Sequence, residues 1–179
     1  MPGHVRGVAL RDWPRLAREL GVNPDELREF TGLTEQHLSQ CPANDVWLPL
    51  GVQIALLHGL RELAAQGDFV QLAVKLDAFV HGEVGMLGRL GLRAMGVRQA
   101  YKRIEETYRY IYRELEVSSL AEPWGIVVTL RGEFVHDPTW QWLQQTIHAI
   151  VLGQLGQQDA DISGENRADA AFVLSIPFR

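Results

Sequence analysis

The stretch LEVSSLAEPWGIVVTLR, residues 115–131, decides the fold class. Residues 115–120 and 124–131 each read as a strand because β-branched and aromatic side chains favour extended structure. Ala-Glu-Pro, residues 121–123, joins them. An antiparallel hairpin is the simplest pairing of two strands so close in the chain.

The residues after this hairpin predict a helix, a polar loop and a last strand. Asp137-Pro138 is a strong helix start, and the helix is expected to end at Gly153 or Gly156. Its predicted buried stripe consists of Trp140, Leu143, Ile147, Ile150 and Val151. Residues 157–169 read as polar loop with a short strand at 160–162. AAFVLSIPF, residues 170–178, predicts a strand buried on both faces or ending at a sheet edge, where Pro177 limits its pairing.

The residues before the hairpin predict helices. Asp12 can cap a helix over 13–20, Asn23-Pro24 opens a second, and Thr34 can cap a third. A longer helix follows Trp47 and ends at Gly67, with apolar side chains on one face. Residues 69–80 have close to ideal helical spacing of apolar side chains, which predicts a core helix.

The predicted fold is therefore α+β: an N-terminal helical region followed by a small, mostly antiparallel sheet packed with helices. No low-complexity linker interrupts the chain. We expect one ligand-binding domain over residues 1–179, with a helical part over about 1–114 and an α+β part over about 115–179.

Four glycines recur every third residue after the predicted core helix: Gly82, Gly85, Gly88 and Gly91. Each costs roughly 1 kcal/mol relative to alanine inside a helix, so bare backbone here suggests a close neighbour. Because a period of three drifts by about 60° per step on an α-helix, the four glycines do not form one stripe. This predicts a bent or broken helix, with Gly85 and Gly88 as a pocket wall and the outer two glycines marking helix ends.

A heptad-like seam follows the glycines. Its apolar positions are Val97, Tyr101, Ile104, Tyr108, Ile111 and Leu115. The seam is shorter than the three or four heptads that indicate a free coiled coil. Packing in the core is the first interpretation, and a dimer interface is the alternative.

Composition excludes several classes of protein. The chain has 179 residues, 46% hydrophobic and 22% charged, as in ordinary globular domains, and its net charge is −5. That charge argues against a general nucleic-acid or anionic-membrane surface. A single cysteine, Cys41, excludes an intramolecular disulfide. No signal peptide and no membrane-spanning apolar run is found, so we expect a cytoplasmic protein.

Motifs for catalysis or metal binding are missing from the sequence. The six histidines form no H-x-x-x-H or H-E-x-x-H pair, and no G-x-S-x-G elbow occurs. The glycine-rich segment matches neither dinucleotide nor Walker patterns. Residues 11–40 look like helix-turn-helix but carry more acidic than basic residues. Their net negative charge is unfavourable for binding the phosphates of DNA. We therefore expect no enzyme, no metal and no direct nucleic-acid binding.

Aromatic side chains with polar tips can line a small-molecule site. We expect such a pocket between the glycine segment, the tyrosine-bearing helix and the sheet. The candidate ligand-binding residues are Trp47, His81, Gly85, Gly88, Tyr101, Tyr108 and Trp124. His81, at the end of the predicted core helix, could also be an axial haem ligand.

Several motifs in order resemble the N-terminal sensory domain of AraC-type transcription regulators, the arabinose-binding-like kind. They are LAREL-Gly21-VNPDEL, FTGLTEQHL, Trp47-LPL, Gly85-ML-Gly88, Val97-RQAYKRI and RYIYRELEV, covering about residues 10–155. The resemblance implies effector binding or dimerisation that is passed to a DNA-binding domain. Residues 156–179 do not read as a double helix-turn-helix, and the last strand, AAFVLSIPFR, departs from the family.

The closing helix, loop and strand also resemble haem-nitric-oxide-binding-like and vinyl-reductase-type ligand-binding domains. That likeness implies haem or a hydrophobic ligand. The tyrosine-serine-arginine signature of haem sensors is missing around Tyr108, so no cofactor is our first expectation and haem at His81 is an alternative.

Together these features predict a non-enzymatic sensory domain in transcriptional or signalling regulation. We expect it to bind a small, fairly apolar effector and to form a homodimer. The alternatives are a protein–protein interaction module without ligand and a haem-binding gas sensor.

Overall fold

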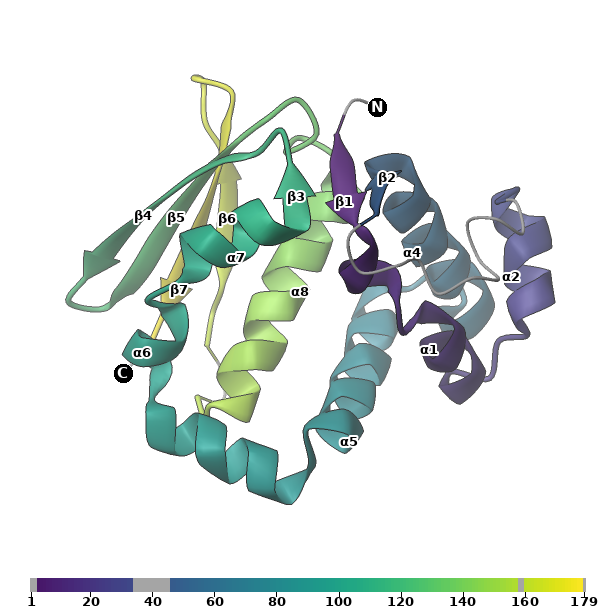
Figure 1. The fold of residues 1–179 in the computed structure, drawn as a ribbon, viewed down its shortest axis with the longest axis horizontal. Helices are drawn as coiled ribbons and strands as arrows, with labels where there is room; N and C mark the ends of the chain where they lie inside the picture. Colours follow the sequence, from purple (N-terminus) through teal and green to yellow (C-terminus); the bar gives the residue numbers. More distant parts are fainter. Residues whose placement is uncertain (1–2, 34–45, 158–159, 179) are drawn as a thin grey trace. The chain divides into compact units, whose positions relative to one another are not determined.

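The computed structural model describes residues 3–33, 46–157 and 160–178, with backbone only at 83–87, 89 and 92. It has helices packed with two small antiparallel sheets, which confirms the α+β prediction. The chain divides into two compact units (Figure 1). The first holds the described residues up to Phe79 with Ile111–Arg113, and the second holds Val80–Tyr110 and the rest from Glu114. The predicted helix after Thr34 lies outside the described residues.

The first unit begins with the predicted helices, each started by a local signal. After a short 3-10 helix, η1 (Gly7–Leu10), come α1 (Trp13–Glu19) and α2 (Pro24–Thr31). The Asn23 side chain accepts a hydrogen bond from the Asp25 backbone N–H at 3.0 Å, so it caps α2. Gly32 ends α2 with φ of 66°, a left-handed conformation that favours glycine. α4 (Leu50–Ala65) follows, and α5 (Phe69–Met95) begins in this unit.

A three-stranded antiparallel sheet in the first unit was not predicted. Its strands, in order β2-β1-β3, are β2 (Trp47–Pro49), β1 (His4–Arg6) and β3 (Tyr112–Arg113). Tyr112, which the seam pattern placed near the end of a helix, is buried in β3, and its hydroxyl donates to Gln53 Oε1 at 3.4 Å. Strands of two or three residues carry no readable periodicity, so sequence pattern could not reveal them.

The glycine segment is part of one helix. α5 (Phe69–Met95) continues through all four glycines, so of the predicted bent or broken helix the break is wrong, as is the prediction that Gly82 and Gly91 mark helix ends. The bent form stays a prediction. A Cβ at either of these two glycines would meet no atom within 4 Å, and Gly88 is exposed. Close packing therefore explains neither Gly82 nor Gly91. The surroundings of Gly85 lie outside the described residues.

The second unit contains most of the predicted seam, divided between two short helices. These are α6 (Val97–Tyr101) and α7 (Ile104–Ile111). Val97, Tyr101, Ile104 and Tyr108 are all less than 9% exposed. The interpretation of these positions as core is confirmed, although the helix itself is interrupted at residues 102–103.

The sheet of the second unit has the order β4-β5-β7-β6 and is antiparallel throughout. β4 (Glu116–Glu122) and β5 (Gly125–Arg131) form the predicted hairpin, with Glu116 opposite Arg131 and Glu122 opposite Gly125. β7 (Ala171–Pro177) pairs with β5 over its whole length and is almost completely buried. β6 (Ser163–Asn166) is an exposed edge strand, three residues later than the predicted one.

The other edge strand, β4, is covered by α7. Glu105 Oε1 accepts hydrogen bonds from the Ser119 backbone N–H at 2.7 Å and hydroxyl at 2.8 Å. The Arg109 guanidinium donates to the Val117 carbonyl at 2.9 Å and to Glu105. The outward N–H of Ser119 and C=O of Val117 are thereby satisfied, which protects this edge from pairing with another strand.

α8 (Pro138–Gln154) packs against β6 and β7 (Figure 1). The Asp137 side chain accepts from the Trp140 backbone N–H at 2.9 Å, which confirms the predicted helix start. Trp140 is fully buried, with its ring 5.3 Å from Phe134 and 6.3 Å from Phe172. The predicted buried stripe is wrong at Ile147 and Val151, which are 40% and 38% exposed. Polar side chains of α8 are buried instead, His148 among them.

Candidate functional site

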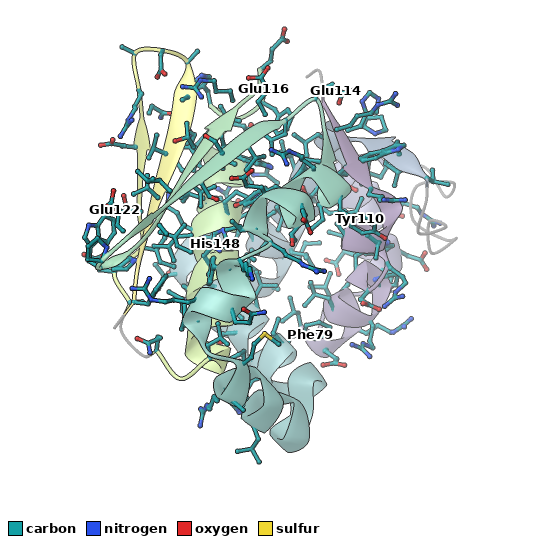
Figure 2. The ribbon with its side chains drawn as sticks, turned by 60° about the vertical axis from the view of Figure 1, so that its left-hand side comes forward. Phe79, Tyr110, Glu114, Glu116, Glu122 and His148 are labelled. Carbon is teal, nitrogen blue, oxygen red and sulfur yellow. The ribbon has the colours of Figure 1, made fainter. Side chains whose placement is uncertain are left out.

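The polar centre of the second unit joins two of the predicted site residues to an unpredicted one. Tyr101 from α6 and Tyr108 from α7 bond to opposite nitrogens of the His148 imidazole on α8. Tyr101 Oη lies 3.0 Å from Nδ1, and Tyr108 Oη lies 2.8 Å from Nε2. All three side chains are buried, as Figure 2 shows for His148 in the interior. We call these three residues the Tyr-His-Tyr cluster.

Burial keeps this cluster neutral. It lowers the pKa of His148 to about 4 and raises the pKa of Tyr101 well above 10, because the interior disfavours any charged form. A neutral imidazole has one donor and one acceptor nitrogen. One tyrosine hydroxyl therefore donates to the ring, and the other accepts from it.

The cluster supports the buried aromatic side chain of Phe178. Phe178, just after β7, stacks on Tyr101 with ring centroids 6.3 Å apart and an angle of 28° between the planes. The Arg98 guanidinium carbon lies 5.5 Å from the centroid of the Phe178 ring. An N–H of the same guanidinium donates to the Pro123 carbonyl at 3.3 Å. Arg98 thus joins α6 to the turn between β4 and β5 and to the end of β7.

A cavity of about 680 Å³ opens beside Phe178 and Arg98. We call it the basic cavity. Its apolar floor consists of Val97, Leu155 and Phe178, each less than 9% exposed. The remaining lining residues are Arg93, Met95, Gly96, Arg98, Gln99, Lys102, Pro123 and Gln157. A cavity of this size with an apolar floor and a few polar groups is typical of a small-molecule site.

Backbone conformation shapes two edges of the basic cavity. Gly96 has φ of 77° and ψ of 156°, a region that side chains strongly disfavour, and it lets the chain turn from α5 into α6. Gly156, with φ of 87°, brings the end of α8 beside Arg93; a Cβ there would lie 3.5 Å from Arg93 Nε. Gly96 and Gly156 thus each have a physical reason, unlike Gly82 and Gly91 inside α5.

The charged side chains that the structure describes in the lining of this cavity are all cationic. Its lining contains Arg93, Arg98 and Lys102 and no carboxylate. Among the described residues, none of these three cations forms an ion pair. The other arginines of the unit whose side chains are described all do: Arg103–Glu106, Arg109–Glu105, Arg131–Asp169 and Arg167–Glu165.

The predicted site residues do not all come together. Trp47 belongs to the first unit, where its ring lies 5.7 Å from the Arg6 guanidinium carbon and 6.0 Å from that of Arg113. His81 is exposed on α5, and its Nδ1 lies 3.5 Å from Gln154 Nε2. Trp124, in the turn of the hairpin, is 47% exposed and accepts at its backbone carbonyl from the Phe178 N–H. Haem binding at His81 stays a prediction.

Sequence reasoning missed His148, Phe178 and Arg98. His148 lies 47 residues from Tyr101 and 40 from Tyr108, so no local motif joins them. Its position among apolar residues of a predicted helix was the one available signal, since a buried histidine needs partners. Arg98 and Lys102 looked like the solvated face of the seam.

The opposite end of the same sheet has a second hollow, of about 390 Å³. We call it the acidic hollow. Its lining residues are Glu114, Glu116, Arg131, Gly132, Glu133, His136, Asp169 and Ala170. Within the described parts of the chain, no group of three or more His, Cys, Asp or Glu side chains could hold a metal ion.

Comparison with known proteins does not assign the chain to a family. No protein-family model matches it, and no curated protein matches it significantly. Over the described residues, no helix is both long and apolar enough to cross a membrane.

Proposed function

We propose that the chain is a non-enzymatic, cytoplasmic sensory domain that binds a small-molecule effector in the basic cavity. The observation that carries this proposal is the cavity of about 680 Å³ with a buried apolar floor of Val97, Leu155 and Phe178. Ligand sites in proteins usually have this size and combine apolar surface with polar groups that orient the ligand.

The Tyr-His-Tyr cluster supports a preformed site. It fixes α6 against α8 through Tyr101 and stacks Tyr101 on Phe178, so the floor of the cavity rests on a hydrogen-bonded network. A preorganised site loses less conformational entropy when a ligand binds.

The same cluster supports a non-enzymatic role. A general base works best with a pKa near the operating pH. Burial lowers the pKa of His148 to about 4, and His148 is not among the residues that line the cavity. His148 is thus suited to holding structure and poorly suited to proton transfer at neutral pH.

Regulatory context comes from the resemblance to sensory domains of AraC-type regulators, which stays a hypothesis. On that hypothesis the bound effector alters a homodimer or a partner protein, with no direct nucleic-acid contact by this chain. The buried seam positions Tyr101 and Tyr108 are unsuited to a dimer interface, so a homodimer would use another surface.

A thermal-shift screen against chemically broad metabolites tests the proposal, with two variants for comparison. Gln99→Trp places a bulky side chain at the exposed rim of the cavity, and Gln71→Trp makes the same change on the exposed surface of α5 in the first unit. A ligand at 100 times its Kd stabilises the folded state by about 2.7 kcal/mol. We expect this stabilisation in the wild type and in Gln71→Trp and its loss in Gln99→Trp.

Two results would contradict the proposal. One is a complete screen in which no compound raises the melting temperature. The other is a compound that stabilises Gln99→Trp as strongly as the wild type, since its site would then lie elsewhere.

A further inference from the structure

We infer that the ligand of the basic cavity is a soluble organic anion with an apolar body, a carboxylate or a phosphate ester on a hydrocarbon or aromatic group. This inference rests on the proposed function and names the ligand class for the same site. Three features carry it: the uncompensated cations, their arrangement around the floor, and the contrast with the rest of the unit.

The uncompensated cations are the first feature. Arg93, Arg98 and Lys102 line one cavity, and among the described residues none has a carboxylate partner. The chain as a whole has a net charge of −5, so carboxylates are in excess. Three like charges around one cavity repel one another, and a bound anion would relieve that repulsion.

The arrangement of polar and apolar groups is the second feature. Arg93, Arg98 and Lys102 are exposed, whereas Val97, Leu155 and Phe178 beneath them are buried. A ligand with one charged end and one apolar end matches both the exposed cations and the buried apolar floor. The Arg98 guanidinium lies over the Phe178 ring and holds the Pro123 carbonyl, so this cation is positioned before any ligand arrives. A guanidinium can bind a carboxylate or phosphate through two parallel hydrogen bonds.

The contrast with neighbouring arginines is the third feature. Arg103, next to Lys102 in the chain, pairs with Glu106 at 3.7 Å and does not line the cavity. Arg131 at the other end of the sheet pairs with Asp169 at 2.7 Å. Ion pairing is therefore the rule in this unit, and the cavity is the exception.

Calorimetric titration of the full chain with charged and neutral analogues tests the inference. The probes are benzoate, octanoate and phenyl phosphate, with benzamide and octanamide as neutral counterparts of similar shape. We expect the best anion to bind about tenfold or more tightly than its neutral counterpart, because hydrogen bonds from guanidinium to an anion are about twice as strong as neutral ones. Affinity should also fall between 50 and 300 mM NaCl, since exposed charges are screened.

Matched variants show which cations contribute to the affinity for the anion. Lys102→Gln should weaken anion binding about fivefold, and Arg103→Gln, the same loss of one charge at the next residue, should change it less than twofold. Arg98→Gln should weaken it more than Lys102→Gln, because Arg98 is held in place. Circular dichroism of each variant checks that it folds. A smaller effect from Lys102→Gln than from Arg103→Gln would overturn the inference.

The outcomes separate the ligand class from the proposed function. Neutral analogues that bind as tightly as the anions would overturn the ligand class and leave the small-molecule site standing. If no metabolite binds in the broad screen either, the proposed function itself fails. A lipid headgroup offers the same phosphate chemistry, so phosphatidylglycerol vesicles are a further probe. Binding to these vesicles without binding to any soluble anion would overturn the inference.

Discussion

The two ends of the four-stranded sheet carry opposite charge patterns. At one end, beside the turn of the β4–β5 hairpin, the basic cavity has three cations and no carboxylate in its lining. At the other, where β4 begins and β5 ends, the acidic hollow has four carboxylates with Arg131 and His136. Figure 2 shows Glu114 and Glu116 at this second end and Glu122 at the opposite end of β4. Glu122 does not line the basic cavity.

The difference between the ends lies in pairing more than in the sign of the charge. In the acidic hollow, Arg131 pairs with Asp169 at 2.7 Å, and His136 Nδ1 lies 3.1 Å from Asn166 Oδ1. In the basic cavity the cations Arg93 and Lys102 point at no carboxylate among the described residues. At one end the described arginine thus pairs within the fold, whereas at the other end no described cation has a carboxylate partner.

The largest expected difference is in the free energy of unfolding, when His148 and His136 are each replaced by alanine. His148→Ala leaves the hydroxyls of Tyr101 and Tyr108 buried without their imidazole partner and opens a void. Each lost hydrogen bond to a buried group costs about 1–3 kcal/mol and the void adds to this, so we expect about 3–5 kcal/mol of destabilisation. His136→Ala, at the exposed histidine of the acidic hollow, should cost within about 1 kcal/mol. Urea denaturation followed by circular dichroism measures both.

A second variant separates the polar penalty from lost packing. Adding Tyr101→Phe to His148→Ala removes one of the two buried hydroxyls that lost a partner. The double variant should therefore be more stable than His148→Ala alone. If it were less stable, lost packing would explain the effect, and the Tyr-His-Tyr cluster would not be the hydrogen-bonded support of the cavity floor.

The pH dependence of stability gives the next largest effect. The pKa of His148 is about 4 in the folded chain, while an unfolded histidine titrates near pH 6.5. Between these values the unfolded chain binds more protons, so the free energy of unfolding falls as pH is lowered through this window and levels off below it. The total loss is about 3 kcal/mol. Because the pKa of Tyr101 is raised above 10, the unfolded chain ionises first in alkali, and stability falls again above pH 10.

Urea midpoints between pH 3.5 and 11 test this profile. His148→Leu should lose the decline between pH 6.5 and 4 and keep the alkaline one, and His136→Ala should keep both. If His148→Leu lost as much stability between pH 6.5 and 4 as the wild type does, that loss would belong to other titrating groups. The neutral state of His148 would then be no part of what holds the basic end.

Local signals in the sequence predicted much of this unit. Asp137-Pro138 starts α8 as expected, because an N-cap acceptor followed by proline acts within one turn. The β4–β5 hairpin was predictable for a similar reason, since its strands are joined by a short connection. In the first unit, β1 pairs with β2 and β3, which are distant in sequence and only three and two residues long, and such pairings leave no local pattern.

The site was less predictable because its contacts are long-range. The spacing of Tyr101 and Tyr108 showed that both face the core, and both do. Their partner His148 and the stacked Phe178 come from elements far along the chain. The charge of the basic cavity was hidden for another reason. An arginine that pairs with a carboxylate and one that does not look alike in sequence, and only the fold distinguishes Arg98 from Arg103.

The smallest effect concerns the ion pair that compensates the acidic hollow. The hydrogen bond from Arg131 is the main reason that the pKa of Asp169 lies below its ordinary value. Arg131→Gln should therefore raise that pKa, measured from the carboxyl carbon shift in an NMR titration. Both side chains are about half exposed, so the effect on stability should be small and should fade with added salt. Arg98→Gln, the same substitution at the basic cavity, should leave the titration of Asp169 unchanged. If Arg131→Gln did not raise the pKa of Asp169, the pair would not persist in solution. The arginine of the acidic hollow would then be unpaired, as Arg98 is in the basic cavity, and arginine pairing would no longer distinguish the end of the sheet where we propose a ligand.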